Sequence, residues 1–194
     1  MVISKEKRLG DIAEILAGVT GFVGTGQHCY NVVQPNSFTE TSIICETELQ
    51  RRNDEIPLKQ LLSSGDILLK RLNPSFVHVV TMETSRMVAS QNILVVRPGT
   101  EIDPFYLGYL LEQKEILGQV EHVTGSAAAI KAISIKKLAD IMIPILPTAE
   151  QQKIGEIWML SRKRKQLLNE YIAENDRLAS MLASQIIASG GIRK

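Results

Sequence analysis

Residues that would support metal or disulfide chemistry are scarce in this chain. Its 194 residues include two cysteines, Cys29 and Cys45, and three histidines, His28, His78 and His122. The cysteines form no C-x-x-C pair and have no histidine cluster nearby, which favours reduced thiols over a zinc site or a disulfide framework. The histidines have no partner at the spacing of a catalytic triad or a metal site, so structural or surface roles are expected for them.

Long apolar runs and a phosphate-binding loop are also missing. No stretch approaches the ~20 apolar residues needed to cross a bilayer, and the N-terminus becomes charged too early for a signal peptide. The G-x-x-x-x-G-K-[ST] pattern of P-loop proteins is absent as well. We therefore expect a soluble, cytoplasmic protein.

Neither sign of charge is in excess, with 22 basic and 21 acidic residues. Phosphate binding is a local property of one basic face, so the balance does not settle whether the chain binds nucleic acid. Basic residues gather at 51–52, 70–71, 136–137 and 162–165. Each group is also compatible with an ordinary solvated surface, and composition leaves DNA binding open.

The apolar patterns predict an α+β head with a mixed or antiparallel, β-rich sheet. Leu9, Ile12, Ile15 and Leu16 recur at helical spacing and predict a short helix that Gly18 ends. A glycine-rich loop is expected at 18–26, and strands are expected at 29–33, 42–46, 66–72, 77–82 and 92–97.

A core helix is expected to follow the sheet. Asp103 and Pro104 suit an N-cap and a first helical position. The apolar stripe of this helix comprises Tyr106, Leu107, Leu110, Leu111 and Leu117. Residues 122–130 predict an exposed loop, and an apolar strand is expected to end at Pro147.

One long helix is predicted to close the chain. Thr148 and Gln151 form a capping-box pattern, and only Gly155 interrupts the residues up to Gly190. A helix of this length is about 60 Å long. Its first apolar residues, Ile154, Ile157 and Trp158, are expected to dock on the head.

Apolar residues farther along this helix follow the 4-3 spacing of a coiled coil. The predicted dimer interface comprises Leu168, Ile172, Asn175, Ala179, Leu182 and Ile186. We expect a head at 1–147, a dimerisation helix at 148–189 that makes the protein a homodimer, and a flexible tail at 190–194.

Two short motifs favour a different function. The run F-V-G-T-G at 22–26 matches the F-x-G-x-G of S-adenosylmethionine-dependent methyltransferases, and N-P-S-F at 73–76 is close to their N-P-P-[YF]. A cofactor-binding glycine turn must follow a buried strand and open a helix, and neither flank fits. An adenine-N6 methyltransferase remains the alternative hypothesis, and a structural or regulatory coiled-coil dimer is a third.

Several further motifs occur in a characteristic order. They are L-G-D-I-A-E-I at 9–15, G-D-I-L-L-K-R at 65–71, S-Q-N at 90–92, D-P-F-Y-L at 103–107, a Gly125–Ser126 loop, I-S-I-K-K-L at 133–138, I-P-I-L-P at 143–147 and E-Q-Q-K-I at 150–154. In this order they resemble a target-recognition domain of the specificity subunits of type I restriction-modification systems.

The resemblance implies a DNA sequence-recognition subunit without catalytic residues or a cofactor of its own. Its partners would be double-stranded DNA, modification (methyltransferase) subunits and, through them, a restriction subunit. Family members usually carry two recognition domains joined by two antiparallel helices, whereas this chain has one of each. It is either a half-length subunit that pairs with itself or a truncated product.

Residues suited to DNA contacts can be assigned on this basis. Lys70, Arg71 and Asn73 at one strand end, and Gln91 and Asn92 at another, supply donors and acceptors for base edges. The Gly125–Ser126 loop permits a close approach to the duplex, and Lys131 and Lys136 would neutralise phosphates.

Overall fold

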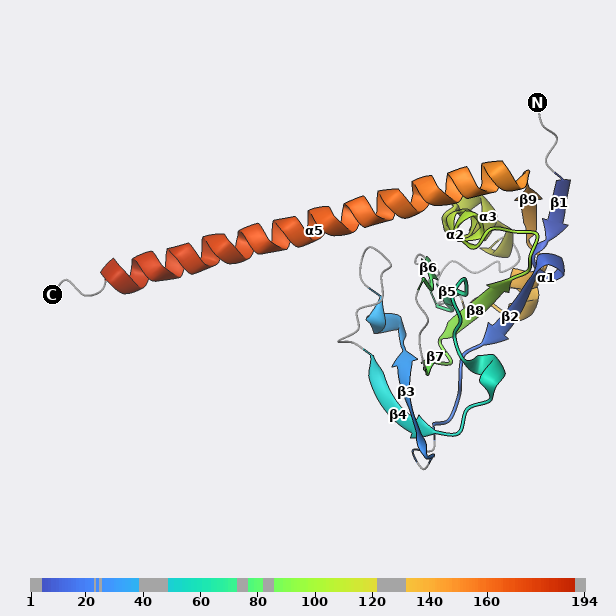
Figure 1. Ribbon diagram of the computed structural model, residues 1–194, viewed down its shortest axis with the longest axis horizontal. Coiled ribbons are helices and arrows are strands. Elements are labelled where there is room, and N and C mark those ends of the chain that lie inside the picture. Colours follow the sequence, from blue (N-terminus) through green and yellow to red (C-terminus); the bar gives the residue numbers. More distant parts are fainter. Residues whose placement is uncertain are drawn as a thin grey trace. The chain divides into compact units, whose positions relative to one another are not determined.

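The computed structural model describes residues 5–22, 24, 26–38, 49–72, 77–81, 86–121 and 132–190. Figure 1 shows the order of their helices and strands. The chain divides into two compact units, residues 1–158 and 159–194. No helix in the described ranges combines the length and apolarity that crossing a bilayer requires.

The first unit is built on three small sheets. A four-stranded antiparallel sheet has the order β2 (Ala13–Ala17), β8 (Ile93–Pro98), β5 (Ile67–Lys70) and β6 (Val77–Val79). In a three-stranded sheet, β3 (His28–Val33) pairs antiparallel with β4 (Gln50–Asp54) and parallel with β7 (Met87–Ala89). β1 (Lys5–Arg8) pairs antiparallel with β9 (Met142–Ile145). The expected mixed and antiparallel β-structure is confirmed.

Short helices complete the first unit. They are α1 (Leu9–Ile12), α2 (Pro104–Glu112), α3 (Lys114–Glu121) and α4 (Ile135–Ala139), with 3-10 turns η1 (Pro35–Ser37) and η3 (Leu58–Gln60). The long helix α5 (Thr148–Gly190) begins in this unit and confirms the expected C-terminal helix. Predictions for 42–46, 122–130 and the last four residues fall outside the described ranges.

The four-stranded sheet separates two apolar cores. Ile67 and Leu69 pack into the core on the helical side, whereas Leu68 points into the core shared with β3 and β7. The same alternation continues on β8, with Leu94 on the first side and Val95 on the second. Each fully buried aliphatic side chain contributes about 1.5–3 kcal/mol, so both faces of this sheet stabilise the fold.

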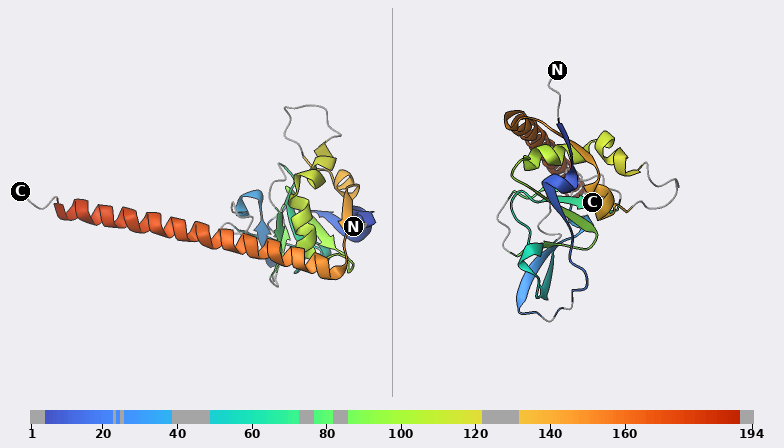
Figure 2. Two further views of the ribbon diagram at one scale, coloured as in Figure 1. Left: turned by 90° about the horizontal axis from the view of Figure 1, so that it is seen from above. Right: turned by 90° about the vertical axis from the view of Figure 1, so that its right-hand side faces the viewer.

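The helices and the three-stranded sheet therefore lie on opposite sides of the central sheet. In Figure 1, β3 and β4 lie at the far end of the unit from α2 and α3, and the right-hand view of Figure 2 agrees.

The helix predicted from Leu9 to Leu16 is wrong in its second half. α1 ends at Ile12, and the next five residues form β2, which pairs antiparallel with β8. Ile15 packs against the helical-side core and Leu16 against the other core, which is the period-two alternation of a strand. Backbone pairing with β8 outweighed a helical pattern only two turns long.

The helix after the sheet begins as predicted and ends earlier. Asp103 accepts hydrogen bonds from the backbone N–H of Phe105 and Tyr106 at 3.0 and 2.9 Å, and Pro104 follows at the first helical position. Gln113 adopts an extended conformation and ends α2. Leu117 therefore lies in α3, although it still packs against the same core.

The capping box predicted for Thr148 and Gln151 is wrong. The backbone N–H of Gln151 donates to Pro147 O, and its buried side chain makes its hydrogen bonds outside the helix. The side-chain oxygen accepts from Asp103 N at 2.8 Å, and the side-chain nitrogen donates to Leu146 O at 2.8 Å. Gln151 thus links α5 to the segment before α2.

Two glycines let α5 approach α2 closely. A Cβ atom on Gly155 would lie 2.7 Å from Asp103 Oδ1 and 2.8 Å from Phe105 Cβ. On α2, a Cβ atom on Gly108 would lie 2.9 Å from the Trp158 ring. The Trp158 indole N–H also donates to Glu112 at 2.8 Å. The expected docking on the head is confirmed for Ile154 and Trp158, which pack against its core, and is wrong for Ile157, which is 69% exposed.

Candidate nucleic-acid interface

Two of the sequence-predicted groups meet at one edge of the central sheet. Lys70 pairs with Ile93 at the end of β5, and the backbone N–H of Arg71 donates to Asn92 O at 2.9 Å. The turn formed by Gln91 and Asn92 joins β7 to β8 and is exposed. The structure therefore brings Lys70 and Arg71 together with Gln91 and Asn92, although the two pairs are 20–22 residues apart in sequence.

The two basic residues of this edge have different surroundings. Arg71 is exposed, so its guanidinium faces solvent. Lys70 is half-buried, and its ammonium lies 5.3 Å from the centre of the Phe38 ring in a cation-π contact. Burial lowers the pKa of Lys70 from its ordinary value. Arg71 is consequently the more accessible of the two cations.

The chain that follows residue 131 returns to the same edge. Ala132 forms a bridge with Leu72, and the N–H of Ile133 donates to Arg71 O at 2.9 Å. Ser134 then caps α4, accepting from Lys137 N at 3.2 Å. Lys136 is exposed on α4. Asn73, Gly125, Ser126 and Lys131 lie outside the described residues, so their positions stay predictions.

A polar cavity of about 340 Å³ lies beside the Gln91–Asn92 turn. Arg52 on β4 lines it, as do Gln34 after β3 and Phe22 in the glycine-rich segment. Ser90 also lines the cavity, and within the described residues its buried hydroxyl has no hydrogen-bond partner. Buried hydroxyls are normally hydrogen-bonded, so this group is available to a water or a ligand atom.

Sequence reasoning missed Arg52 and Gln34 as members of this site. The segment Gln50–Asp54 carries no apolar residue and therefore no strand-like alternation. The sequence did contain one signal for a DNA-contacting segment. Arg51 and Arg52 stand between Gln50 and Asn53, and all four side chains can hydrogen-bond to bases.

The glycine-rich run at 22–26 does not have the surroundings of a cofactor-binding turn. Among its described residues, none is helical, and the chain continues into β3. A Cβ atom on Gly26 would lie 2.0 Å from the backbone of Asp54, so this glycine permits a close strand contact. The run N-P-S-F at 73–76 lies outside the described residues.

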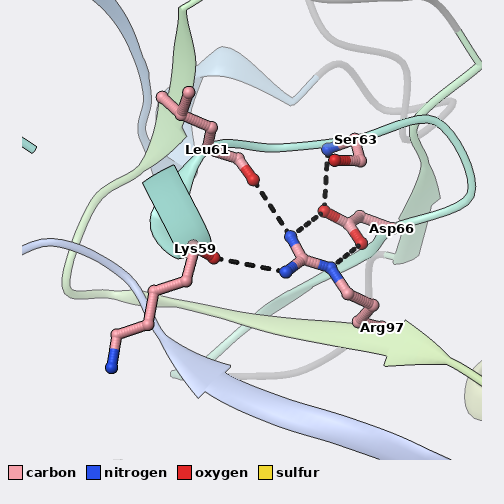
Figure 3. A network of polar contacts seen from close by, with 5 residues as sticks. All are labelled: Lys59, Leu61, Ser63, Asp66 and Arg97. Atoms are coloured by element: carbon pink, nitrogen blue, oxygen red, sulfur yellow. Dashed lines mark hydrogen bonds and ion pairs between the residues drawn. The ribbon is translucent and has the colours of Figure 1, made fainter. Parts of the chain in front are cut away.

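One partly buried ion pair holds the segment before β5 in place (Figure 3). Arg97 on β8 donates from Nε and Nη2 to the two carboxylate oxygens of Asp66, both at 2.8 Å. The guanidinium also donates to Leu61 O at 3.0 Å and Lys59 O at 3.2 Å, and Asp66 accepts from Ser63 N.

Hydrogen bonding to Asp66 raises the pKa of Arg97. Because both carboxylate oxygens of Asp66 accept hydrogen bonds from donors of the same chain, we assign this pair a structural role. Within the described residues, no three His, Cys, Asp or Glu side chains are arranged to hold a metal ion.

The second unit presents apolar side chains to solvent along α5. The residues predicted for the dimer interface are all exposed, with Leu168 at 52%, Ile172 at 56%, Leu182 at 58% and Ile186 at 71%. Asn175 lies in the same row, and its side chain donates to Tyr171 O at 3.1 Å. Within the described part of this unit, no other segment covers the row.

Comparisons with known proteins agree on one family. The sequence model of the family described as the type I restriction modification DNA specificity domain matches residues 1–170. A putative specificity subunit of the type I restriction enzyme MjaX from Methanocaldococcus jannaschii is 26% identical over 160 residues, covering 78% of this chain and 37% of that protein.

Solved structures share the fold. The HsdS subunit from Thermoanaerobacter tengcongensis has a TM-score of 0.66 at 17% identity, over 95% of this chain and 48% of that one. The S subunit of a type I restriction-modification system from M. genitalium has a TM-score of 0.62 at 14% identity, over 95% of this chain and 46% of that one. The chain thus spans less than half the length of these relatives.

Proposed function

Because the chain belongs to the family of type I restriction-modification DNA specificity domains, we propose that it binds duplex DNA and selects the sequence, without catalysing a reaction itself. The observation that carries this proposal is the sheet edge at which Arg71, Gln91 and Asn92 meet. The side chains of these residues make no hydrogen bond within the described residues and are exposed. Such groups match phosphates and base edges.

The roles of the residues follow from their chemistry. Arg71, Lys136 and Lys131 contact phosphates, and Lys70 raises the local potential. Gln91, Asn92 and Asn73 face base edges, and the Gly125–Ser126 loop permits close backbone approach to the duplex. The head comprises residues 1–147 and needs no cofactor or metal.

We further propose that residues 148–189 pair with a second copy of the chain. Burying four side chains such as Leu168, Ile172, Leu182 and Ile186 stabilises an interface by about 1–2 kcal/mol each at their present exposure. Asn175 in the same row would penalise wrong registers.

The charges of the helix favour an antiparallel pair. Residues 162–165 are all basic, whereas Glu170, Glu174 and Asp176 are acidic. Parallel pairing would place the two basic blocks side by side. Antiparallel pairing about Arg177 sets Leu168 opposite Ile186, Ile172 opposite Leu182 and Asn175 opposite Ala179, and it keeps the two basic blocks apart.

Two identical heads would then recognise two identical half-sites. The expected target is an interrupted palindrome whose spacing is set by the helices. Joining two heads also raises avidity above that of one. The paired helices would bind modification subunits, which carry the cofactor and the methyl-transfer chemistry, and through them a restriction subunit. The complex would work in the cytoplasm.

Affinity selection from a pool of duplexes with a random core tests the recognition proposal. The wild-type chain, with its modification subunit, should enrich one bipartite motif. Arg71→Ala should weaken binding to all sequences and lower the salt slope by about 2, because each of the two heads loses one phosphate contact. Enrichment of no motif by the wild-type complex would contradict the proposed function.

Sedimentation equilibrium tests the pairing. The double variant Leu168→Glu and Ile172→Glu should be monomeric at concentrations where the wild type is dimeric. The matched control is Ala173→Glu, which adds a charge on the opposite side of the helix and should stay dimeric. A wild-type chain that is monomeric at high concentration would contradict the homodimer.

A further inference from the structure

The strands β3 and β4 form an antiparallel ribbon at the edge of the three-stranded sheet. Their register pairs Asn31 with Arg51 and Cys29 with Asn53. β7 pairs with the β3 residues from Asn31 onward, so β4 has a neighbour on one side only. In Figure 1 and in the right-hand view of Figure 2 the ribbon lies at the end of the first unit opposite α2 and α3.

The two faces of the ribbon differ in chemistry. Tyr30 and Val32 point to one side and pack into a small core with Val88. Their pairing partners on β4, Arg52 and Gln50, share that side. Because successive side chains alternate, the other face carries Cys29, Asn31, Val33, Arg51 and Asn53. Val33 is buried in the core shared with the central sheet, and we call the other four residues the ribbon face.

The ribbon face is exposed and its polar groups are unused. Cys29, Arg51 and Asn53 are exposed and Asn31 is half-buried. Within the part of the chain that the structure describes, the side chains of Asn31, Arg51 and Asn53 make no hydrogen bond or ion pair. Neighbouring Arg52, in contrast, donates to Gln50 at 3.2 Å.

The charge of the ribbon face is positive. Arg51 is its one ionised residue, and no carboxylate lies on it. Asp54 lies on the opposite face, paired with His28, and accepts from the N–H of Glu55 at 2.9 Å. The ribbon face therefore suits an anionic partner that offers hydrogen-bonding groups in a row.

We infer that this ribbon enters the major groove of duplex DNA, with Asn31, Arg51 and Asn53 facing the base edges. The inference rests on the proposed function and locates its sequence readout. A two-stranded antiparallel ribbon fits a groove about 12 Å wide. β4 can enter such a groove because it is an edge strand, whereas a strand with neighbours on both sides could not.

Side-chain chemistry assigns the bases. Arg contacts guanine O6 and N7 with two donors, and Asn contacts adenine N6 and N7 with a donor and an acceptor. Residues two apart on a strand are roughly 7 Å apart, which corresponds to about two base-pair steps of 3.4 Å. Arg51 and Asn53 thus read base pairs two steps apart, and Asn31 lies across the ribbon from Arg51.

The sheet edge at Arg71 and the ribbon face have separable roles. A phosphate contact weakens binding to every sequence and contributes to the salt slope, whereas a base contact sets preference at one position. The same selection experiment can therefore distinguish them.

Selection from random duplexes with the variants Arg51→Ala and Asn53→Ala is the first test. Each variant should bind the wild-type motif about ten- to a hundredfold more weakly and lose preference at one position of each half-site, with the salt slope nearly unchanged. Lys114→Ala, which removes the same charge from α3, is the matched control and should leave motif and affinity unaltered. Fluorescence of Trp158 verifies that each variant is folded.

The outcomes separate the two proposals. If the wild-type complex selects no motif, the proposed function fails. If it selects a motif and both ribbon variants select the same motif with unchanged affinity, the ribbon inference is overturned. A uniform loss with a shallower salt slope would also overturn it, because Arg51 would then be a phosphate contact.

Cys29 provides a second test that requires no loss of binding. In a Cys45→Ser background it is the chain's one cysteine, and its thiol lies on the ribbon face beside Asn53. The selected duplex should slow alkylation of Cys29 at least tenfold, whereas a cysteine placed at Glu115 on α3, in a background lacking Cys29, should react at the same rate with and without DNA. Unprotected Cys29 in the bound complex would contradict the inference.

Discussion

Replacing Gly155 by alanine should destabilise the first unit, although the same change normally stabilises a helix. Alanine in place of glycine favours a helix by about 1 kcal/mol. Here the new Cβ atom would lie 2.7 Å from Asp103 Oδ1 and 2.8 Å from Phe105 Cβ. Overpacking of this kind costs about 1–3 kcal/mol, and displacing the Asp103 cap costs about 1 kcal/mol more.

The net effect is a loss of about 1–3 kcal/mol. For a unit of this size each kcal/mol lowers Tm by roughly 2–4 °C. The assay is urea or thermal unfolding followed by fluorescence of Trp158, the chain's one tryptophan, whose ring lies against Gly108 at this contact.

Gly118 provides the matched control. It lies in α3, and a Cβ atom there would meet nothing within 4 Å. Gly118→Ala should therefore stabilise the protein by up to about 1 kcal/mol. If Gly155→Ala proved as stable as the wild type or more so, the close approach of α5 to α2 would be refuted.

Further substitutions test other parts of the structure. Asp66→Asn should lower the unfolding free energy by about 1–3 kcal/mol, because it leaves the Arg97 guanidinium without its charged partner; denaturant titration measures this, and an unchanged midpoint would contradict the role given to the pair. Tyr106 donates to Pro144 O at 2.8 Å, so Tyr106→Phe should cost about 1 kcal/mol by the same measurement. Burial raises the pKa of Tyr106 above that of the unfolded chain. The stabilisation that its neutral hydroxyl provides is therefore complete below the unfolded pKa and declines as pH rises through the folded pKa. Tyr106→Phe should remove this part of the loss of stability at alkaline pH, and identical plots of stability against pH for variant and wild type would argue against it. Lys70→Met should weaken DNA binding less than Arg71→Met in a filter-binding assay, because the Lys70 ammonium lies over Phe38; equal losses would show that both reach phosphate.

The parts of the fold that the sequence predicts well are those with a strong local signal. The apolar runs of β5 and β8 mark buried strands, and Asp103–Pro104 marks a helix start because both residues act within one turn. The length of α5 follows from the scarcity of helix breakers after Thr148.

Other parts depend on contacts that local patterns do not contain. Residues 13–17 are a strand because β8 is available as a partner. Gln50–Asp54 is a strand that no apolar residue marks, because its side chains are exposed on both faces. Gln151 matches a capping pattern, but tertiary contacts with the segment before α2 occupy its amide. Sequence reasoning also named Lys70, Arg71, Gln91 and Asn92 without showing that they meet, since this depends on the register of β5 against β8.

The most direct test of the whole account is a map of methylated adenines in host cells that express the modification subunit with and without this chain. We predict one interrupted palindromic motif that is methylated only when the chain is present and that changes at defined positions with Arg51→Ala. A methylation pattern that is identical with and without the chain would contradict the claim that it selects the DNA sequence.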